Sequence, residues 1–196
     1  MKTPTDTDPP MMMDLTGRIL IAMPGMQDPR FGQSIIFVCA HSAEGAMGLV
    51  LNKLADDLKL SDLLEQLDIE AAPGARQMPI HFGGPVESGR GFVLHEAGYR
   101  SSISTLDVDG RFSMTATLDI LEDMAAGGGP GHALIALGYA GWGSGQLEEE
   151  IARNGWLICD ASTELIFGTP NSAKWSAALA ILGIDPVALS SEAGTA

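Results

Sequence analysis

The sequence predicts an α+β fold with a curved sheet that is largely antiparallel or mixed. Two observations on the order of the segments lead to this prediction. Strand-like segments crowd the first half of the chain, and regular βαβ alternation, which a doubly wound parallel sheet requires, is missing from the start. The composition agrees, because 24 glycines and 11 prolines in 196 residues favour short elements joined by sharp turns.

The first segments predict three strands. Residues 18–23 form a short apolar run that Pro24 and Gly25 close. Residues 33–41 and 46–52 are rich in apolar residues, and the sequence SAEG at 42–45 separates them. We therefore expect the second and third strands to form a hairpin.

The middle of the chain predicts one helix followed by short strands. Residues 58–69 carry leucines at helical spacing, with Ser61 as the expected N-cap and acidic residues in the first turn. A loop at 71–77 separates this helix from the strands expected at 79–82, 91–95, 101–106 and 111–115.

The second half predicts alternating helices and strands. Thr117 is the expected N-cap of a helix that ends before the glycines at 127–131. Strands are expected at 132–139 and 156–159, a helix at 146–153 with Ser144 as its N-cap, and a final helix at 172–182.

The sequence predicts one domain, from residue 14 to residue 190. Residues 1–13 contain three prolines and no periodic pattern, so they predict a disordered leader, and residues 191–196 predict a flexible tail. The length is that of a single domain with a full core, and no internal repeat is present.

Composition excludes several classes of protein. Hydrophobic residues are 45% of the chain, which is too many for intrinsic disorder. The 11 basic and 25 acidic residues give a net charge of −14, and residues 76–111 contain four arginines but also four acids. Because affinity for nucleic acid comes from cations displacing counterions at phosphates, direct nucleic-acid binding is disfavoured.

The location expected from the sequence is the cytoplasm. The longest uncharged apolar runs have six residues, whereas a spanning helix needs about 20, so no membrane contact is expected. The first residues lack the apolar stretch of a signal peptide. Cys39 and Cys159 both lie inside apolar runs, which predicts buried, reduced thiols.

Sequence motifs for cofactors, metals and nucleophiles fail when they are tested against their chemistry. The glycine-rich segment at 138–145 precedes a helix that starts with three glutamates, which would repel a phosphate. Ser144 lacks the flanking glycines of a hydrolase elbow, and no Cys-x-x-Cys or paired-histidine motif is present. We therefore assign no cofactor, no metal and no catalytic residue from the sequence, and interpret the acidic runs as solvated faces.

One set of polar residues remains as a candidate site. Cys39 and His41 are two positions apart on one strand and should share a face, with Asn52 near the far end of the neighbouring strand. His95 ends another strand. These four side chains could converge at one sheet edge, where an imidazole would activate the thiol. The alternative is that Cys39 packs in the core and the polar groups satisfy turn backbone.

The sequence also resembles a known family, the bacterial YqgE/AlgH family, collinearly over residues 15–184. The motifs that carry this resemblance are LIAMP at 20–24, CAH at 39–41, GAMGLVLN at 45–52, GGPV at 83–86, RGFVLH at 90–95, LGYAGW at 137–142 and GQLEEEI at 145–151. The resemblance implies a single-domain cytosolic α+β protein with a partly barrel-like sheet surrounded by helices. Its motif positions here are His41, Asn52, Gly83, Gly84, Pro85, Arg90 and His95; the resemblance assigns none of them a catalytic role.

Three hypotheses of function follow. The first is a non-catalytic protein with a regulatory role that acts through a protein or small-molecule partner, with Cys39 and the motif residues as the ligand or interaction site. The alternative is an enzyme, a hydrolase or a thiol-dependent protein, that uses Cys39, His41 and His95. The third is a transcriptional regulator that binds DNA directly, which the charge balance disfavours.

Overall fold

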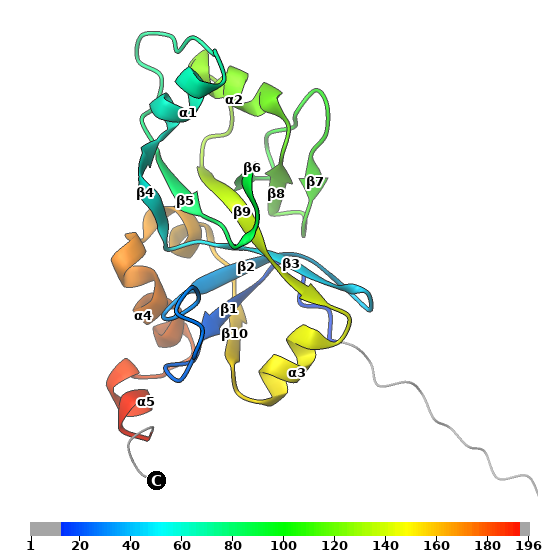
Figure 1. Cartoon of the computed structure of the whole chain (residues 1–196), viewed down its shortest axis with the longest axis vertical. Coiled ribbons are helices and arrows are strands. Elements are labelled where there is room, and N and C mark those ends of the chain that lie inside the picture. Colours follow the sequence, from blue (N-terminus) through cyan, green and yellow to red (C-terminus); the bar gives the residue numbers. More distant parts are fainter. Residues whose placement is uncertain (1–12, 193–196) are drawn as a thin grey trace, which may run out of the picture.

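The computed structural model describes residues 13–192, and in them ten strands form one curled, mostly antiparallel sheet (Figure 1). The strands are β1 (Arg18–Ala22), β2 (Ile35–Ser42), β3 (Gly45–Val50), β4 (Leu54–Lys59), β5 (Pro79–Phe82), β6 (Val86–Glu96), β7 (Leu106–Asp107), β8 (Phe112–Thr115), β9 (Ala133–Gly143) and β10 (Trp156–Asp160). The helices are α1 (Leu60–Gln66), α2 (Leu118–Ala125), α3 (Gln146–Ala152), the π-helix η1 (Glu164–Gly168), α4 (Asn171–Ile181) and α5 (Pro186–Glu192). This arrangement confirms the predicted α+β fold class.

The strand order is β10-β1-β2-β3-β9-β6-β8-β7, with β5 beside β9 and β4 beside β5. The first and last strands of the chain pair antiparallel, with Ile19 opposite Cys159. β2 and β3 form the predicted hairpin, and Ser42 lies opposite Gly45. Apolar and β-branched residues dominate β2, as expected for a strand that is buried on both faces.

Strand β9 is the place where the sheet divides. Its residues from Ile135 to Leu137 pair with β5 in parallel, whereas its residues from Ala140 to Gly143 pair with β3. Gly138 lies between these two segments and has φ of +73°, a conformation that favours glycine. Strand β9 therefore changes its neighbours at a kink at Gly138.

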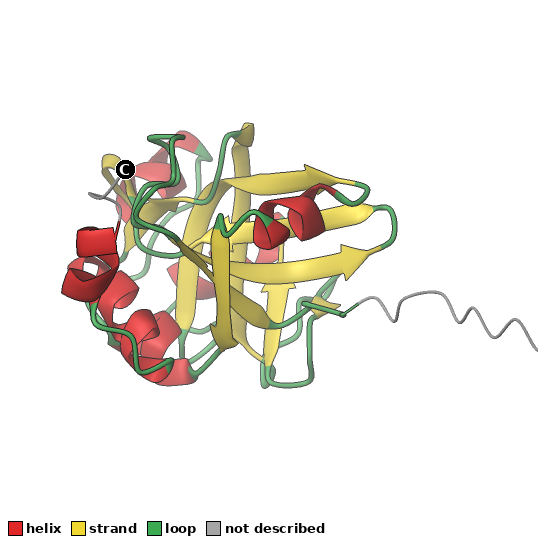
Figure 2. Cartoon of the chain, turned by 90° about the horizontal axis from the view of Figure 1, so that it is seen from below, coloured by secondary structure: helices red, strands yellow, loops and turns green. Residues whose placement is uncertain are grey.

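Three hydrophobic clusters hold the helices against the sheet. The largest contains one face of β1 and β2 together with Trp175 and Leu179 of α4, and the opposite face packs around Leu147 of α3. The third contains residues of α1 and α2 against β5, β6 and β9. Figure 2 shows the resulting arrangement, with helices on the outside of the curled strands.

Most predicted elements are present, but two predicted helix caps are wrong. Helix α1 begins after Lys59, not Ser61, because the chain enters it directly from β4, a strand that the sequence did not predict. Helix α3 begins after Gly145, which has a left-handed backbone, and Ser144 instead donates its hydroxyl to the carbonyl of Ala43 at 2.6 Å. The π-helix η1 and helix α5 were also not predicted.

The strand predicted at 101–106 is wrong except at its last residue. Side chains, not a neighbouring strand, satisfy the backbone there: Ser101 Oγ accepts the N–H groups of Ile103 and Ser104, and Asp119 accepts the N–H of Ser102 at 2.9 Å. Serine and aspartate compete with sheet ladders in this way, so the segment is a loop fastened to the start of α2.

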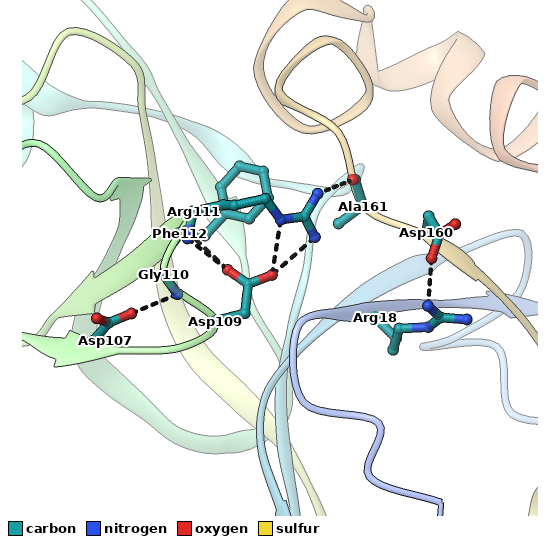
Figure 3. A network of polar contacts seen from close by, with 8 residues as sticks. All are labelled: Arg18, Asp107, Asp109, Gly110, Arg111, Phe112, Asp160 and Ala161. Carbon is teal, nitrogen blue, oxygen red and sulfur yellow. Dashed lines mark hydrogen bonds and ion pairs between the residues drawn. The ribbon is translucent and has the colours of Figure 1, made fainter.

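A polar network ties the turn between β7 and β8 to the end of β10 (Figure 3). Asp109 accepts the backbone N–H groups of Arg111 and Phe112, both at 3.0 Å, and pairs with the Arg111 guanidinium at 2.8 Å. Arg111 also donates to the carbonyl of Ala161 at 3.0 Å. The last strands of the curled sheet are thus fastened to a distant part of the chain.

Two predictions concern the ends of the chain. Residues 1–12 of the predicted leader and 193–196 of the predicted tail lie outside the described residues, while residues 191 and 192 continue α5. Among the helices that the structure describes, none has the length and apolar character that crossing a membrane requires.

Candidate functional site

Cys39 is a core residue in the structure. It is 1% exposed and packs in the largest hydrophobic cluster, with its sulfur 3.8 Å from the Phe37 carbonyl oxygen. Burial raises the pKa of the thiol to about 12. A reactive cysteine needs the opposite shift, because the thiolate is the nucleophile. The prediction that both cysteines are buried and reduced is confirmed, since Cys159 is also a buried free thiol.

His41 lies on the face of the sheet opposite to Cys39, so the prediction of a shared face is wrong. The register between β2 and β3 shifts between Val38 and Ala40, and such a bulge reverses which side chains face each side. His41 Nδ1 accepts the backbone N–H of Leu15 at 3.1 Å, and Nε2 lies 2.7 Å from a carboxylate oxygen of Glu148 on α3.

Asn52 and His95 each satisfy local groups. The Asn52 side chain accepts the N–H of Ile35 at 3.1 Å and donates to the Gln33 carbonyl at 2.9 Å. His95 is fully buried, with Nδ1 donating to the Glu96 carbonyl at 2.8 Å and Nε2 accepting from Thr115 at 2.8 Å. Burial lowers the pKa of His95. The four predicted residues therefore occupy separate surroundings.

The Gly-Gly-Pro motif lies where the chain between β5 and β6 crosses β9, at the kink of that strand. A side chain at Gly83 would overlap the Gly138 carbonyl, and one at Gly84, where φ is +152°, would overlap the backbone of Tyr139. Gly83 also donates to the Leu137 carbonyl at 2.8 Å and accepts from Val50 at 2.9 Å. These glycines allow the chain between β5 and β6 to touch the backbone of β9.

Arg90, the remaining motif residue, is half-exposed on β6. Its guanidinium lies 5.1 Å from the ring centre of Phe92 and 3.4 Å from the Glu87 carboxylate. Neither contact joins it to the other candidate residues.

A cleft with a volume of about 680 Å³ lies beside α3. We call it the tryptophan cleft. It is lined by Gly25, Met26, Gln27, Asp28, Arg30, Phe31, Pro85, Ala140, Gly141, Trp142, Gln146, Glu150, Arg153, Gly155 and Trp156. The volume falls within the range of about 300–1,000 Å³ that is typical of small-molecule sites. Pro85 is the one predicted site residue in this lining.

One carboxylate holds both tryptophans of the cleft. Glu150 Oε2 accepts the indole N–H of Trp142 at 3.0 Å and that of Trp156 at 2.8 Å, while Oε1 accepts the side-chain amide of Gln146 at 3.0 Å. The two indoles are 7% and 3% exposed and meet edge to face, with 6.1 Å between ring centres. Their positions are therefore fixed by packing and by hydrogen bonds to a charged acceptor.

Aromatic and cationic groups complete the cleft. The Phe31 ring packs edge to face on Trp156 at 6.0 Å between centres. Arg30 forms a bidentate ion pair with Asp28, and the shorter N–O distance is 2.7 Å. Arg153 has a side chain that is 82% exposed, and its nearest carboxylate oxygen, on Glu149, is 4.0 Å away. The cleft thus combines an apolar floor with two guanidinium groups.

A shallow groove of about 500 Å³ adjoins the tryptophan cleft, since Gly141 and Trp142 line both. His41 lines this groove, and its partner Glu148 lies on α3 two positions before Glu150. Helix α3 therefore connects the cleft to His41 and, through it, to Leu15 near the start of the described chain.

Sequence reasoning missed the cleft because it interpreted residues 148–150 as a solvated acidic face. The structure corrects this for Glu148 and Glu150, which bind His41 and the two indoles. A usable signal was present: two tryptophans flank one short helix in sequence, and a buried indole N–H needs an acceptor. Among the described residues, no group of three or more His, Cys, Asp or Glu side chains is arranged to hold a metal ion.

Comparisons with known proteins agree with the fold. A family model described as AlgH-like matches residues 19–187. A UPF0301 protein of Cereibacter sphaeroides is 55% identical over 184 residues, which cover 94% of this chain and all of that protein. A UPF0301 protein of Jannaschia is 56% identical over 189 residues, covering 96% of this chain and 98% of that protein.

Two solved structures are similar as well. The AlgH protein from Pseudomonas aeruginosa, also named UPF0301, superposes with a TM-score of 0.76 at 43% identity, and both chains are covered completely. Protein DIP2367 from Corynebacterium diphtheriae has a TM-score of 0.61 at 19% identity over 82% of each chain, which shows a shared fold. With its family model matched over most of its length and its relatives aligned nearly end to end, this chain belongs to the AlgH-like, or UPF0301, family.

Proposed function

We propose that the protein is a non-catalytic binding protein, and that the tryptophan cleft takes a small ligand with an apolar body and an acidic group. The observation that carries this proposal is the pair of indoles that Glu150 holds at the floor of a 680 Å³ cleft. A floor that is fixed before a ligand arrives lowers the entropic cost of binding.

The chemistry of the lining supports the acidic group. Arg30 is already engaged by Asp28 at 2.7 Å, whereas Arg153 at the same cleft has only a long, exposed contact of 4.0 Å with Glu149. A guanidinium binds carboxylates and phosphates through parallel hydrogen bonds. Phe31 and Met26 are partly exposed and offer apolar contact to the rest of the ligand.

The position of α3 supports a regulatory role. This helix contributes Glu150 to the cleft and Glu148 to His41, whose Nδ1 accepts the backbone N–H of Leu15. A ligand that contacts α3 would alter the contact between Glu148 and His41, and with it the position of the residues around Leu15. A protein partner that binds these residues would respond to that change. We place this role in the cytoplasm and expect no direct contact with nucleic acid, which the net charge of −14 disfavours.

Tryptophan fluorescence tests the proposal, because two of the three tryptophans line the cleft. The third, Trp175, is bound to the Ala22 carbonyl in the core. The probes are cyclohexylacetate, phenylacetate and adenosine monophosphate, each compared with a neutral analogue: the amide for the two acids and adenosine for the nucleotide. We expect a saturable change with at least one acidic probe and a weaker one with its neutral analogue.

The matched variants are Arg153→Gln and Arg100→Gln, which remove the same charge inside the cleft and on an exposed loop. We expect Arg153→Gln to weaken binding about tenfold or more, the loss for one charge-assisted hydrogen bond, and Arg100→Gln to leave it unchanged. Absence of saturable binding with every probe, or an equal loss in both variants, would refute the proposal.

A further inference from the structure

Lys174 of α4 is a buried cation for which the described side chains supply no opposite charge. It is 3% exposed, and its Nζ donates to the backbone carbonyl of Leu51 at 2.9 Å. The ion pairs among the described residues do not include it. An ammonium group has three hydrogens to donate, so this contact leaves two of them for other acceptors.

A buried charge of this kind is costly, because water is removed and the hydrogen bond to the Leu51 carbonyl replaces it only in part. Burial lowers the pKa of Lys174 to about 8, which still leaves much of the amine protonated at neutral pH. The chain has 25 acidic residues, yet none of the described ones is placed beside this amine. A methionine of similar length would fill the same space without a buried charge and would lose only the hydrogen bond to the Leu51 carbonyl.

Lys174 lines a second cleft, which we call the Lys174 cleft, with a volume of about 360 Å³. It lies between the start of α4, η1 and the strands β5 and β9, away from the tryptophan cleft. The polar lining includes His81, Thr169 and Asn171, and the apolar lining includes Met78, Ile166 and Phe167. The cleft therefore has a cationic, hydrogen-bonding part and an apolar part.

His81 and Asn171 are held in fixed orientations beside the lysine. His81 Nδ1 donates to the Ile135 carbonyl at 3.2 Å, so Nε2 is free to accept the Asn171 amide N–H at 3.0 Å. Burial, and next the charge of Lys174, lower the pKa of His81, so this imidazole is neutral and does not compete with the lysine for an anion. The second N–H of Asn171 remains available as a donor.

We propose that the Lys174 cleft binds a small organic acid, whose carboxylate pairs with Lys174 and Asn171 and whose short apolar chain contacts the partly exposed Met78 and Phe167. The carboxylate supplies a negative charge beside Lys174, which none of the described side chains provides. Helix α4 begins at the same cleft, after Pro170, and the positive end of a helix favours an anion there. This site is independent of the tryptophan cleft and goes beyond the function proposed for it.

Thermal unfolding at pH 6.5 tests this site, with sodium propionate, butyrate and succinate compared with sodium chloride at equal ionic strength. For the native chain we expect a saturable rise in Tm, on the order of 5 °C when the acid far exceeds its Kd. Inorganic phosphate is a separate arm. A saturable rise with phosphate and none with the carboxylates would overturn the assignment to an organic acid.

The decisive variants are Lys174→Met and, as a matched control, Lys53→Met, which removes the same charge from a partly exposed position. Lys174→Met should unfold in chloride at a Tm equal to or above that of the native chain and should lose the rise with acid, whereas Lys53→Met should keep it. Asn171→Ala provides a second probe, with an expected severalfold weaker binding of the acid. A rise that persists in Lys174→Met, or no rise with any carboxylate in the native chain, would overturn the proposal.

Discussion

At the scale of single residues, Gly83 and Gly84 of the GGP motif have a structural role, although the sequence placed them among the candidate binding residues. Gly84 lies where the connection between β5 and β6 crosses β9, and its φ of +152° belongs to a region that side chains rarely adopt. The backbone of Tyr139 occupies the space that a Cβ would need. The two glycines of the motif therefore maintain the division of the sheet.

This role predicts a large effect of Gly84→Ala. We expect the free energy of unfolding to fall by at least about 3 kcal/mol, because backbone strain and overlap with Tyr139 add together. Gly89→Ala on β6 is the control, since a Cβ there has nothing within 4 Å, and it should change stability by less than about 1 kcal/mol. Urea unfolding monitored by circular dichroism measures both, and equal stabilities of the two variants would contradict the role of Gly84.

The bulge at Cys39 explains why the predicted shared face of Cys39 and His41 is wrong. Alternation along a strand predicts that Cys39 and His41 share a face, and this rule fails because the bulge after Val38 inserts one residue without a partner. Nothing in the sequence IIFVCAHS marks the bulge, since it contains neither glycine nor proline. The separation of thiol and imidazole is thus a property of the paired strands and not of β2 alone.

At the scale of elements, helix α3 is short but carries the contacts that organise the tryptophan cleft. It has seven residues and one buried apolar side chain, Leu147, so packing alone gives it little support. Its attachment comes instead from polar contacts: Glu148 binds His41, and Glu150 binds both indoles. The acidic face of α3 is therefore partly an internal surface.

This attachment predicts a clear difference between two neighbouring glutamates. Glu150→Ala leaves two buried indole N–H groups without their acceptor, and we expect a loss of about 2–4 kcal/mol in the free energy of unfolding. Glu149→Ala removes an exposed carboxylate from the same helix and should cost less than about 1 kcal/mol. The tryptophan emission of native Glu150→Ala should also shift to longer wavelength. Equal losses in the two variants would show that Glu150 does not hold the indoles.

The elements themselves were largely predictable, whereas their contacts were not. The β2–β3 hairpin, β5 and helix α4 follow from apolar runs bounded by turn residues, and these are local signals. The segment at 101–105 could not be assigned this way, because its conformation depends on Asp119, fourteen or more positions later. The same applies to the clefts: Glu150 lies close to its tryptophans in sequence, but Lys174 meets Leu51 only after the fold has formed.

At the scale of the whole molecule, the buried histidines link stability to pH. His81 and His95 are both buried, and burial lowers the pKa of each below its usual value near 6.5. The native chain therefore keeps these imidazoles neutral at pH values where the unfolded chain has already bound protons. Acid then favours the unfolded state, so this contribution to stability is complete above pH 6.5 and decreases as pH falls below it.

We expect the free energy of unfolding to decrease from pH 7 to pH 5, with a limiting slope of about 1.4 kcal/mol per pH unit for each histidine that remains neutral. The window ends at pH 5 because carboxylates with lowered pKa values, such as Asp119 and Asp28, add their own pH dependence of stability at lower pH.

Two histidine variants test this origin of the slope. His95→Asn keeps a donor near the position of Nδ1 but cannot bind this proton, so its slope should be shallower than that of the native chain. His132→Asn changes a histidine whose side chain is 56% exposed and should retain most of the native slope. Urea unfolding at half-unit pH steps measures the three slopes; if His95→Asn kept the full native slope while His132→Asn lost it, the buried histidines would not be the source of the acid sensitivity.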